Sequence, residues 1–266
     1  MSDSKVIVIT GASRGMGKTM SEIILERSET AKIVMVARSE DKLKEFFDLL
    51  PKKDQKRVHY IAGDLTDDST SDKIINETIE KFGKINSVIF NAGILEPISH
   101  IDKLDTKLMR RLFEVNFFSI VELTQKLIPL LRESAQNDGF PSSCIYVSSS
   151  ASEHCYDGWL AYGASKASVN HLAMDLNSEE FNVIRTASID PGIVDTGMQV
   201  NIRENLGTGM KDEAHQMFLE LHENGKLLKP EVPGGVCALL ALNGIPQEIS
   251  GKYLEYCDKS LDAFQY

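Results

Sequence analysis

A tyrosine and a lysine four residues apart are the side chains of this sequence best suited to proton transfer. Tyr162 and Lys166 form a Y-x-x-x-K pattern in a stretch with helical character, where residues four apart share one face. A phenol has a pKa of about 10, and a neighbouring ammonium group favours the phenolate. We therefore expect Lys166 to lower the pKa of Tyr162 toward neutrality. The same pattern is common in helices that have only a structural role. The catalytic interpretation is therefore supported mainly by the serines at 148–150 just before the pattern and by a glycine turn upstream.

The glycine turn follows the first strongly apolar run, and two phosphate-binding motifs compete there. A Walker A loop needs G-x-x-x-x-G-K-[ST]; Gly17-Lys18-Thr19 fits its end, but its first glycine would fall on Ala12. The glycines at 11, 15 and 17 instead follow G-x-x-x-G-x-G, a variant of the dinucleotide-binding turn. In that interpretation they turn the chain from strand to helix and let the backbone approach a pyrophosphate at the helix N-terminus. An ordinary glycine-rich turn is the alternative.

The residues after the second predicted strand indicate which dinucleotide would bind. A ribose 2′-hydroxyl site needs an acidic residue about 20 residues beyond the glycine turn. Ala37, Arg38 and Ser39 occupy that position instead. Arg38 and Arg14 would suit a 2′-phosphate, because a guanidinium group matches phosphate geometry. We therefore predict NADP(H) as the cofactor, and two solvated surface arginines are the alternative.

The elements that must position these residues alternate along the whole chain. Short apolar, β-branched runs alternate with longer amphipathic ones, which is typical of a parallel sheet covered on both faces. The predicted fold class is therefore α/β, a doubly wound (Rossmann) parallel seven-stranded sheet with helices on both faces. The predicted strands are Val6–Thr10, Ile33–Ala37, Val58–Ala62, Ser87–Phe90, Cys144–Ser148, Val183–Ile189 and Lys252–Tyr256. The predicted helices are Gly17–Ser28, Asp41–Leu50, Asp67–Phe82, Asp105–Glu133, Leu160–Glu180 and Gly234–Leu242.

One segment, Gln199–Lys229, interrupts this alternation late in the chain. It holds three glycines around a possible helix and lies between two predicted strands. Long insertions of this kind often carry function, so residues 199–229 are a candidate substrate lid. A surface excursion that only packs is the alternative.

Composition limits the classes of protein that fit. With 266 residues, 42% hydrophobic and 26% charged, the chain is an ordinary globular one, and we predict one domain over residues 1–266. Its net charge of −10 disfavours nucleic acid or an anionic membrane surface as a partner. No apolar run approaches the about 20 residues that span a bilayer.

Cysteine and histidine spacing points away from disulfides and metals. The cysteines lack C-x-x-C spacing and no signal peptide precedes the first strand, so we expect reduced thiols and a cytoplasmic location. The histidines show no H-E-x-x-H pattern, and no metal site is predicted. These residues are Cys144, Cys155, Cys237, Cys257, His59, His100, His154, His171, His215 and His222.

Taken together, the motifs resemble those of the short-chain dehydrogenase/reductase family over nearly the whole chain. All elements of the family's motif set are present. In chain order they are T-G-x-x-x-G-x-G, an aspartate on the adenine side, N-A-G, a helix asparagine, a serine, Y-x-x-x-K and P-G. They fall on Thr10 to Gly17, Asp64-Leu65, Asn91-Ala92-Gly93, Asn116, Ser149, Tyr162 and Lys166, and Pro191-Gly192 followed by Thr196. The resemblance implies hydride transfer between a nicotinamide and a carbonyl or alcohol.

The resemblance also implies a role for each matching residue. Ser149, preferred over its serine neighbours on family spacing, would hydrogen-bond the carbonyl oxygen, and Tyr162 would protonate it. Lys166 would hold the nicotinamide ribose and lower the tyrosine pKa, while Asn116 would position a water that relays protons to Lys166. The implied cofactor-binding residues are Gly11, Ser13, Arg14, Gly15, Met16, Gly17, Arg38, Ser39, Asp64, Leu65, Asn91, Ala92, Gly93, Tyr162, Lys166, Pro191, Gly192, Val194, Thr196 and Met198.

Three segments resemble a narrower group, the fungal members of the family that act as benzil reductases and are related to sepiapterin reductases. They cover residues 112–119, 156–162 and 191–199. An apolar wall with Leu95, Tyr156 and Trp159 beside the catalytic tyrosine would suit a small apolar or aromatic ketone or 1,2-diketone. By the same resemblance, the protein is expected to form a homodimer or homotetramer.

Two other functions stay open. A 3-oxoacyl-[acyl-carrier-protein] reductase would need a basic docking patch, which this acidic chain does not visibly offer. A catalytically idle nucleotide-binding sensor or scaffold is the non-enzyme alternative. The presence of Asn116, Ser149, Tyr162 and Lys166 argues against it.

Overall fold

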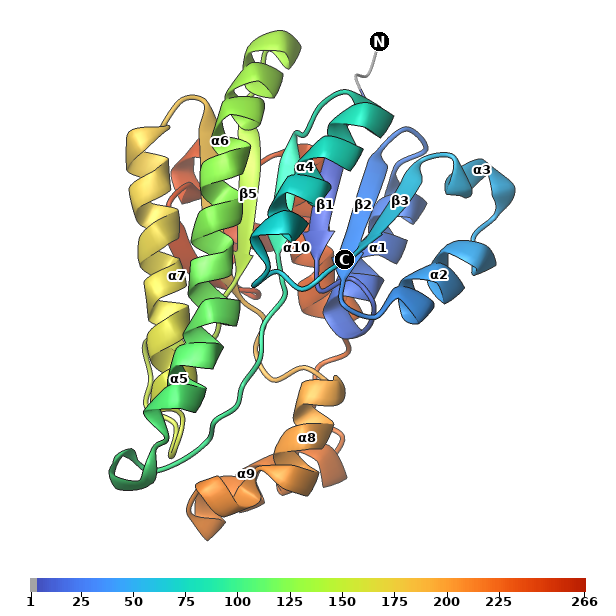
Figure 1. The fold of residues 1–266 in the computed structure, drawn as a ribbon. Helices are drawn as coiled ribbons and strands as arrows, with labels where there is room; N and C mark the ends of the chain where they lie inside the picture. The colour runs from blue at the N-terminus through green and yellow to red at the C-terminus, as the bar shows by residue number, and fades with distance from the viewer. Residues whose placement is uncertain (1–3) are drawn as a thin grey trace.

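A seven-stranded parallel sheet forms the centre of the structure, a computed structural model that describes residues 4–266 (Figure 1). The spatial order of its strands is β3-β2-β1-β4-β5-β6-β7, and every neighbouring pair runs parallel. The strands are β1 (Val6–Thr10), β2 (Lys32–Ala37), β3 (Val58–Ala62), β4 (Ser87–Phe90), β5 (Ser142–Val147), β6 (Ile184–Asp190) and β7 (Lys252–Glu255). The predicted fold class is confirmed.

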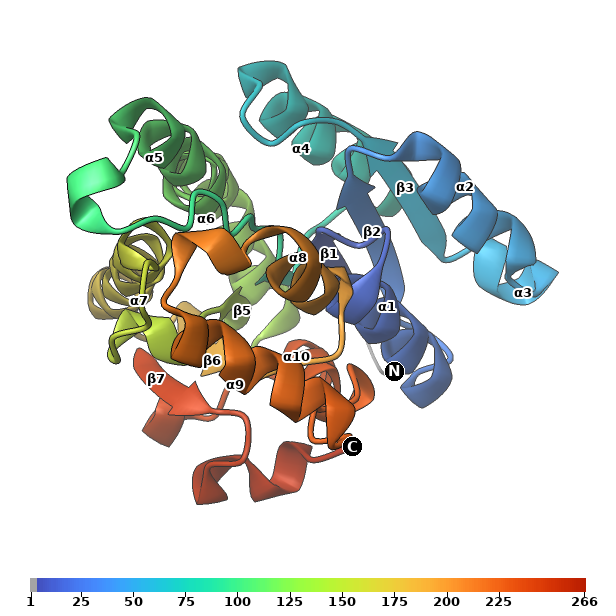
Figure 2. The ribbon, with the colours of Figure 1, turned by 90° about the horizontal axis from the view of Figure 1, so that it is seen from below.

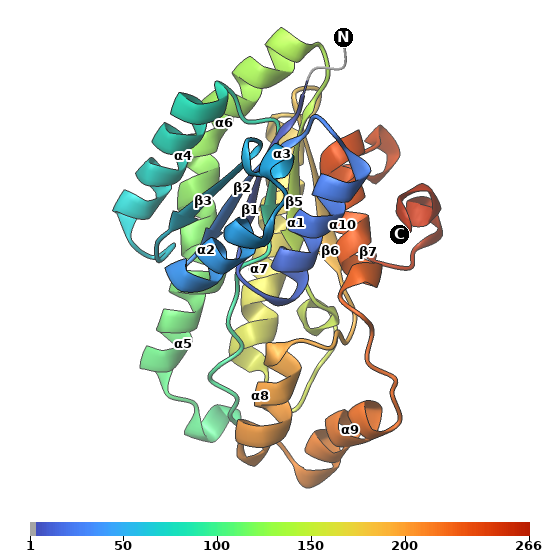
Figure 3. The same ribbon diagram turned by 90° about the vertical axis from the view of Figure 1, so that its right-hand side faces the viewer.

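Helices cover both faces of this sheet, which is why its central strands are apolar throughout (Figure 3). One face packs against α1 (Gly15–Arg27), α2 (Glu40–Leu49) and α10 (Glu231–Asn243). The other packs against α4 (Asp68–Phe82), α6 (Ser119–Asp138) and α7 (Leu160–Glu179). A short helix, α3 (Lys52–Gln55), precedes β3, and the 3₁₀ segment Lys259–Phe264 follows β7.

The long helix predicted over Asp105–Glu133 is interrupted. It consists of α5 (Thr106–Phe113), a π-helical segment (Glu114–Phe118) and α6, which continues to Asp138 and ends at Gly139 in the left-handed conformation (φ 75°). Single π-helical turns inside α-helices are frequent at functional sites. This one contains Asn116.

The strand order reverses between β1 and β4, and this reversal defines where a ligand can enter. The chain moves outward from β1 through β2 to β3, then crosses to β4 on the other side of β1. In an open parallel sheet the loops diverge at such a point and leave a crevice at the carboxyl ends of the strands. Figure 2 shows α8 (Gly197–Asn205) and α9 (Asp212–Glu223) lying across this edge.

The predicted insertion at residues 199–229 corresponds to α8, a short 3₁₀ turn (Gly207–Gly209) and α9. Its two ends lie side by side, because Val194 bridges Leu228 and Asp195 N–H donates to the Leu228 carbonyl at 2.8 Å. The segment is therefore a helical excursion with paired ends. Its movement as a lid stays a prediction.

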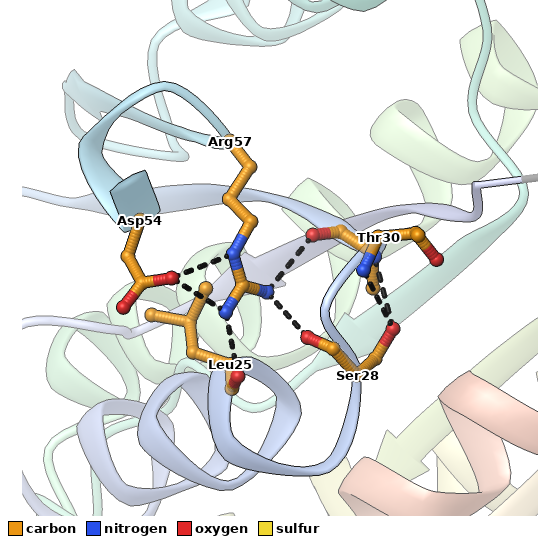
Figure 4. A network of polar contacts seen from close by, with 6 residues as sticks. Leu25, Ser28, Thr30, Asp54 and Arg57 are labelled. Atoms are coloured by element: carbon orange, nitrogen blue, oxygen red, sulfur yellow. Dashed lines mark hydrogen bonds and ion pairs between the residues drawn. The ribbon is translucent and has the colours of Figure 1, made fainter. Parts of the chain in front are cut away.

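Arg57 ties the end of α1 to the start of β3 (Figure 4). Its guanidinium donates to the backbone carbonyls of Leu25 at 2.6 Å, Ser28 at 2.7 Å and Ala31 at 3.2 Å. It also pairs with Asp54 at 2.8 Å. The side chains of the ion pair are only 11% and 13% exposed, so the network satisfies carbonyl groups that water reaches poorly.

Replacing Arg57 by Leu is expected to lower the free energy of unfolding by about 2–4 kcal/mol, because it leaves these carbonyls and Asp54 without their donor. Chemical denaturation monitored by circular dichroism would measure the change. The exposed neighbour Lys56 provides the control, since Lys56→Leu should stay within about 0.5 kcal/mol. Equal stability of the two variants would show that the Arg57 network contributes nothing.

Candidate active site

A cavity of about 370 Å³ lies at the carboxyl ends of the strands. Its walls come from the segments after β1, β2, β3, β4, β5 and β6, together with α7, α8 and α9. All predicted cofactor-binding residues except Gly17 line it. Ser149, Tyr162 and Lys166 also line it, so the fold brings the glycine turn and the proton-transfer group into one cavity.

The glycine turn is packed too tightly for side chains at two positions. Gly11 has φ +69°, and a Cβ there would lie 2.8 Å from Asn91 Nδ2. A Cβ on Gly17 would lie 2.2 Å from the Gly11 carbonyl oxygen. Gly17 therefore serves the packing of α1 against the end of β1. The pyrophosphate contact that the sequence interpretation gave to Gly17 stays a prediction.

The turn has the features that a dinucleotide requires. Helix α1 starts at Gly15 without a side-chain cap from Arg14, and Gly15 and Met16 face the cavity with the positive end of the helix dipole. Arg14, Arg38 and Ser39 line the same region. Asp64 also lines it and accepts hydrogen bonds from Thr66 N–H at 3.0 Å and from the Thr66 hydroxyl at 2.9 Å.

Tyr162 and Lys166 lie on α7 and face the loop after β5. The Lys166 ammonium donates to the Val147 carbonyl at 2.7 Å and lies 5.6 Å from the centre of the Tyr162 ring. Ser149 lies in the loop after β5, and its side chain is near enough to the Tyr162 hydroxyl to lower the pKa of that phenol. Lys166 and Tyr162 are 3% and 6% exposed, so burial dominates the titration of both.

Burial raises the pKa of Tyr162 above its ordinary value, and the nearby Ser149 side chain offsets only part of that increase. The expectation that Lys166 would lower this pKa toward neutrality is wrong for this structure, because desolvation of the phenolate outweighs its neighbours. Burial also lowers the pKa of Lys166 to about 8. At neutral pH the phenol therefore holds its proton and the amine is largely charged.

Asn116 does not line the cavity but supports its wall. Its Oδ1 accepts from Ile94 N–H at 2.8 Å, and its Nδ2 donates to the Ile94 carbonyl at 2.8 Å and to Ser165 Oγ at 3.2 Å. The π-helical turn at residues 114–118 carries this side chain, which is fully buried. Its role in a water relay to Lys166 stays a prediction.

Aromatic residues form part of the cavity wall. Tyr156 and Trp159 line the cavity as expected, whereas Leu95 is 1% exposed, packed in the adjoining apolar cluster and absent from the lining. The Trp159 ring stacks on Phe218 of α9 with centroids 5.5 Å apart and planes 4° from parallel. Its indole N–H donates to the sulfur of Met210 at 3.3 Å.

Two of the lining residues that the sequence interpretation missed come from the helical excursion. Phe218 lies in α9, and Gln199 lies in α8 with a buried side-chain oxygen that has no hydrogen-bond partner among residues 4–266. Neither matches a motif. The only signal was their place inside the insertion predicted as a lid, which does not say which side chains face inward.

Within residues 4–266, no group of three or more His, Cys, Asp and Glu residues could hold a metal ion. No helix in the same range is long and apolar enough to cross a bilayer.

Comparisons with known proteins agree with this geometry. The family model described as short chain dehydrogenase matches residues 5–207. The benzil reductase ((S)-benzoin forming) of Saccharomyces cerevisiae is 42% identical over 267 residues, which cover 98% of this chain and 99% of that one. The protein of the same name from Bacillus cereus is 29% identical over 252 residues, with 91% and 96% coverage.

A solved structure supports the same conclusion. The KRED1-Pglu enzyme superposes with a TM-score of 0.89 at 47% sequence identity, covering 94% of this chain and 100% of that one. Three observations lead to one assignment. They are the strand order, these comparisons, and the cavity that brings the glycine turn together with Ser149, Tyr162 and Lys166. The chain belongs to the short-chain dehydrogenase family of oxidoreductases, whose fold binds a nicotinamide cofactor.

Proposed function

We propose that this protein is an NADPH-dependent carbonyl reductase acting on small apolar or aromatic ketones and 1,2-diketones. The observation that carries the proposal is the aromatic wall of Tyr156, Trp159 and Phe218 in the same cavity as the proton donor Tyr162. Such a wall suits a flat apolar ligand better than a polar one. The two relatives named benzil reductase support this substrate class.

The preference for NADPH rests on charge at the end of β2. Arg38 and Ser39 follow the strand, and the acidic residue expected of a 2′-hydroxyl site is absent there. Arg14, from the glycine turn, lines the same cavity. Two guanidinium groups are suited to a 2′-phosphate, which carries negative charge and several acceptor oxygens.

The proposed mechanism assigns one step to each catalytic side chain. A bound nicotinamide would supply the hydride to the carbonyl carbon. Ser149 donates a hydrogen bond to the carbonyl oxygen, and Tyr162 transfers its proton to that oxygen as negative charge develops. Lys166 holds the ribose of the cofactor and, as an ammonium group, favours the phenolate that remains after proton transfer. The raised pKa of Tyr162 keeps the donor protonated at neutral pH.

A purified-enzyme assay of NADPH consumption tests the proposal. Benzil, 1-phenylpropane-1,2-dione and butane-2,3-dione should all be reduced at one carbonyl, because the second carbonyl withdraws electron density from the first. The aromatic substrates should have the higher kcat/KM. Reduction of acetoacetyl thioesters without reduction of the aromatic diketones would move the assignment to an acyl-carrier-protein reductase. Binding of NADPH with no turnover of any carbonyl would favour the idle nucleotide sensor.

Truncating Trp159 to Ala is expected to raise KM for benzil about tenfold more than KM for butane-2,3-dione, a difference of about 1.4 kcal/mol. Only the aromatic substrate loses stacking area. Steady-state kinetics with both substrates measures the ratio, and Phe47→Ala, which removes an aromatic ring paired with Tyr60 outside the cavity, is the control. A proportional change in both KM values would show that Trp159 supports the fold of the wall without contacting the substrate.

A further inference from the structure

Asn170 lies on the same face of α7 as the proton-transfer pair. It follows Lys166 by four residues and Tyr162 by eight, and residues at this spacing stack along one side of a helix. Its side chain is not among those that line the cavity. It belongs to no motif discussed above.

The Asn170 amide connects α7 to the loop that carries Ser149. The Ser148 hydroxyl donates to Asn170 Oδ1 at 2.6 Å, and Asn170 Nδ2 donates to the Ser152 hydroxyl oxygen at 2.9 Å. The Ser152 hydroxyl in turn donates to the Ser149 carbonyl at 2.7 Å, beside a backbone hydrogen bond from Ser152 N–H at 2.9 Å. The residues on both sides of Ser149 are thus attached to one side chain of the helix.

The direction of these hydrogen bonds requires an amide at position 170. A serine hydroxyl has one proton, and Ser152 uses it toward the Ser149 carbonyl, so Ser152 can only accept from residue 170. Ser148 uses its proton toward residue 170, which must therefore accept. Among side chains of this size, only asparagine offers one acceptor and one N–H donor. An aspartate would accept from Ser148 but would draw the Ser152 proton away from Ser149.

We propose that Asn170 is a positioning residue that holds the Ser149 side chain beside the Tyr162 hydroxyl. The inference rests on the proposed reductase function, in which both hydroxyls contact the substrate carbonyl. Tyr162 is fixed by α7, whereas Ser149 lies in a loop, so their separation depends on the connection between the loop and the helix. The Lys166–Val147 hydrogen bond connects the start of this loop to α7. The Asn170 side chain connects the residues on both sides of Ser149, and it acts from outside the cavity.

Four variants test the proposal: Asn170→Leu, Asn170→Asp, Ser152→Ala and the double variant Asn170→Leu/Ser152→Ala. Both Asn170 substitutions should lower kcat for diketone reduction at least about tenfold while KM for NADPH stays within about twofold. The double variant should be no slower than Asn170→Leu alone, because both changes break the same connection. Ser168→Ala is the matched control, since Ser168 bonds only the Ala164 carbonyl of its own helix at 2.9 Å, and its kcat should not change.

The pH profile gives a readout that a purely structural role would not move. Reduction needs a charged Lys166, whose pKa is lowered to about 8, and a protonated Tyr162, whose pKa is raised. The value of kcat therefore falls first as the pH rises through the pKa of the lysine and again through the pKa of the phenol. Ser149 lowers the pKa of Tyr162, so releasing Ser149 should move the second fall, the one that belongs to the phenol, to higher pH and leave the first in place. Lys166 and Asp190, the charged groups beside Tyr162, are the same in all variants. The shift therefore reports on Ser149.

The proposal would be overturned if Asn170→Asp or Asn170→Leu had a normal kcat and an unshifted pH profile. It would also be overturned if the reductions in kcat caused by Asn170→Leu and Ser152→Ala multiplied in the double variant. Should Asn170→Leu fail to fold, Asn170→Asp and Ser152→Ala still decide the question. Absence of diketone reduction by the unmodified protein overturns the proposed function instead. The same variants then form a double-mutant cycle in unfolding free energy, and zero coupling between residues 170 and 152 overturns the connection itself.

Discussion

Tyr162→Phe is expected to lower kcat for carbonyl reduction by at least about a hundredfold, the scale of losing one general acid. The substitution removes the phenol hydroxyl and leaves the ring packed edge-on against Trp159, with the ring centroids 5.7 Å apart. Folding and cofactor binding should therefore persist. Steady-state NADPH oxidation measures the loss, and a fluorescence titration with NADPH checks that the binding site survives.

Tyr60→Phe is the matched control for this prediction. Tyr60 lies on β3, pairs with Phe47 and lies outside the cavity, so losing its hydroxyl should leave kcat unchanged. Turnover of Tyr162→Phe at the rate of the unmodified protein would mean that the proton comes from another group. The role assigned to Tyr162 would then be wrong.

Arg38→Asp is expected to weaken NADPH binding by one to two decades, because losing one charge-assisted contact to the 2′-phosphate costs about 1.5–3 kcal/mol. The new carboxylate would also repel that phosphate and accept from a 2′-hydroxyl, so NADH binding should improve. Fluorescence titration of both cofactors gives the ratio of dissociation constants. Arg110→Asp makes the same charge change at an exposed position of α5 outside the cavity and should leave the ratio as it is.

Equal or better use of NADH by the unmodified protein would contradict the cofactor assignment. In that case Arg14 and Arg38 would be solvated surface residues, the alternative that the sequence left open. The family membership would stand, because it rests on the fold and the motifs and not on the 2′-phosphate.

Three of the strands and the catalytic group could be predicted because local sequence determines them. The observed bounds of β1, β3 and β4 match the predicted ones, since each is a short, largely apolar run that ends at a glycine or polar turn. Tyr162 and Lys166 share a helix face by spacing alone, and the structure places both in one cavity with Ser149. These features need no knowledge of distant contacts.

Other features depend on tertiary packing and could not be predicted. The sign of the Tyr162 pKa shift follows from how deeply the fold buries the phenol, not from the lysine four residues away. The contribution of Phe218 depends on how α9 folds back over Trp159, across a stretch without motifs. The break between α5 and α6 is a π-helical turn, which hydrophobic periodicity does not reveal.

Transfer of deuterium from the cofactor to benzil tests the central claim most directly. With NADPH deuterated at both C4 positions, we expect one cofactor molecule to be consumed per molecule of diketone. The benzoin formed should carry one deuterium on its carbinol carbon, detected by mass spectrometry. Formation of unlabelled benzoin would contradict the assignment of this protein as an NADPH-dependent diketone reductase. So would a reaction in which no benzoin forms and both benzil and NADPH remain unchanged.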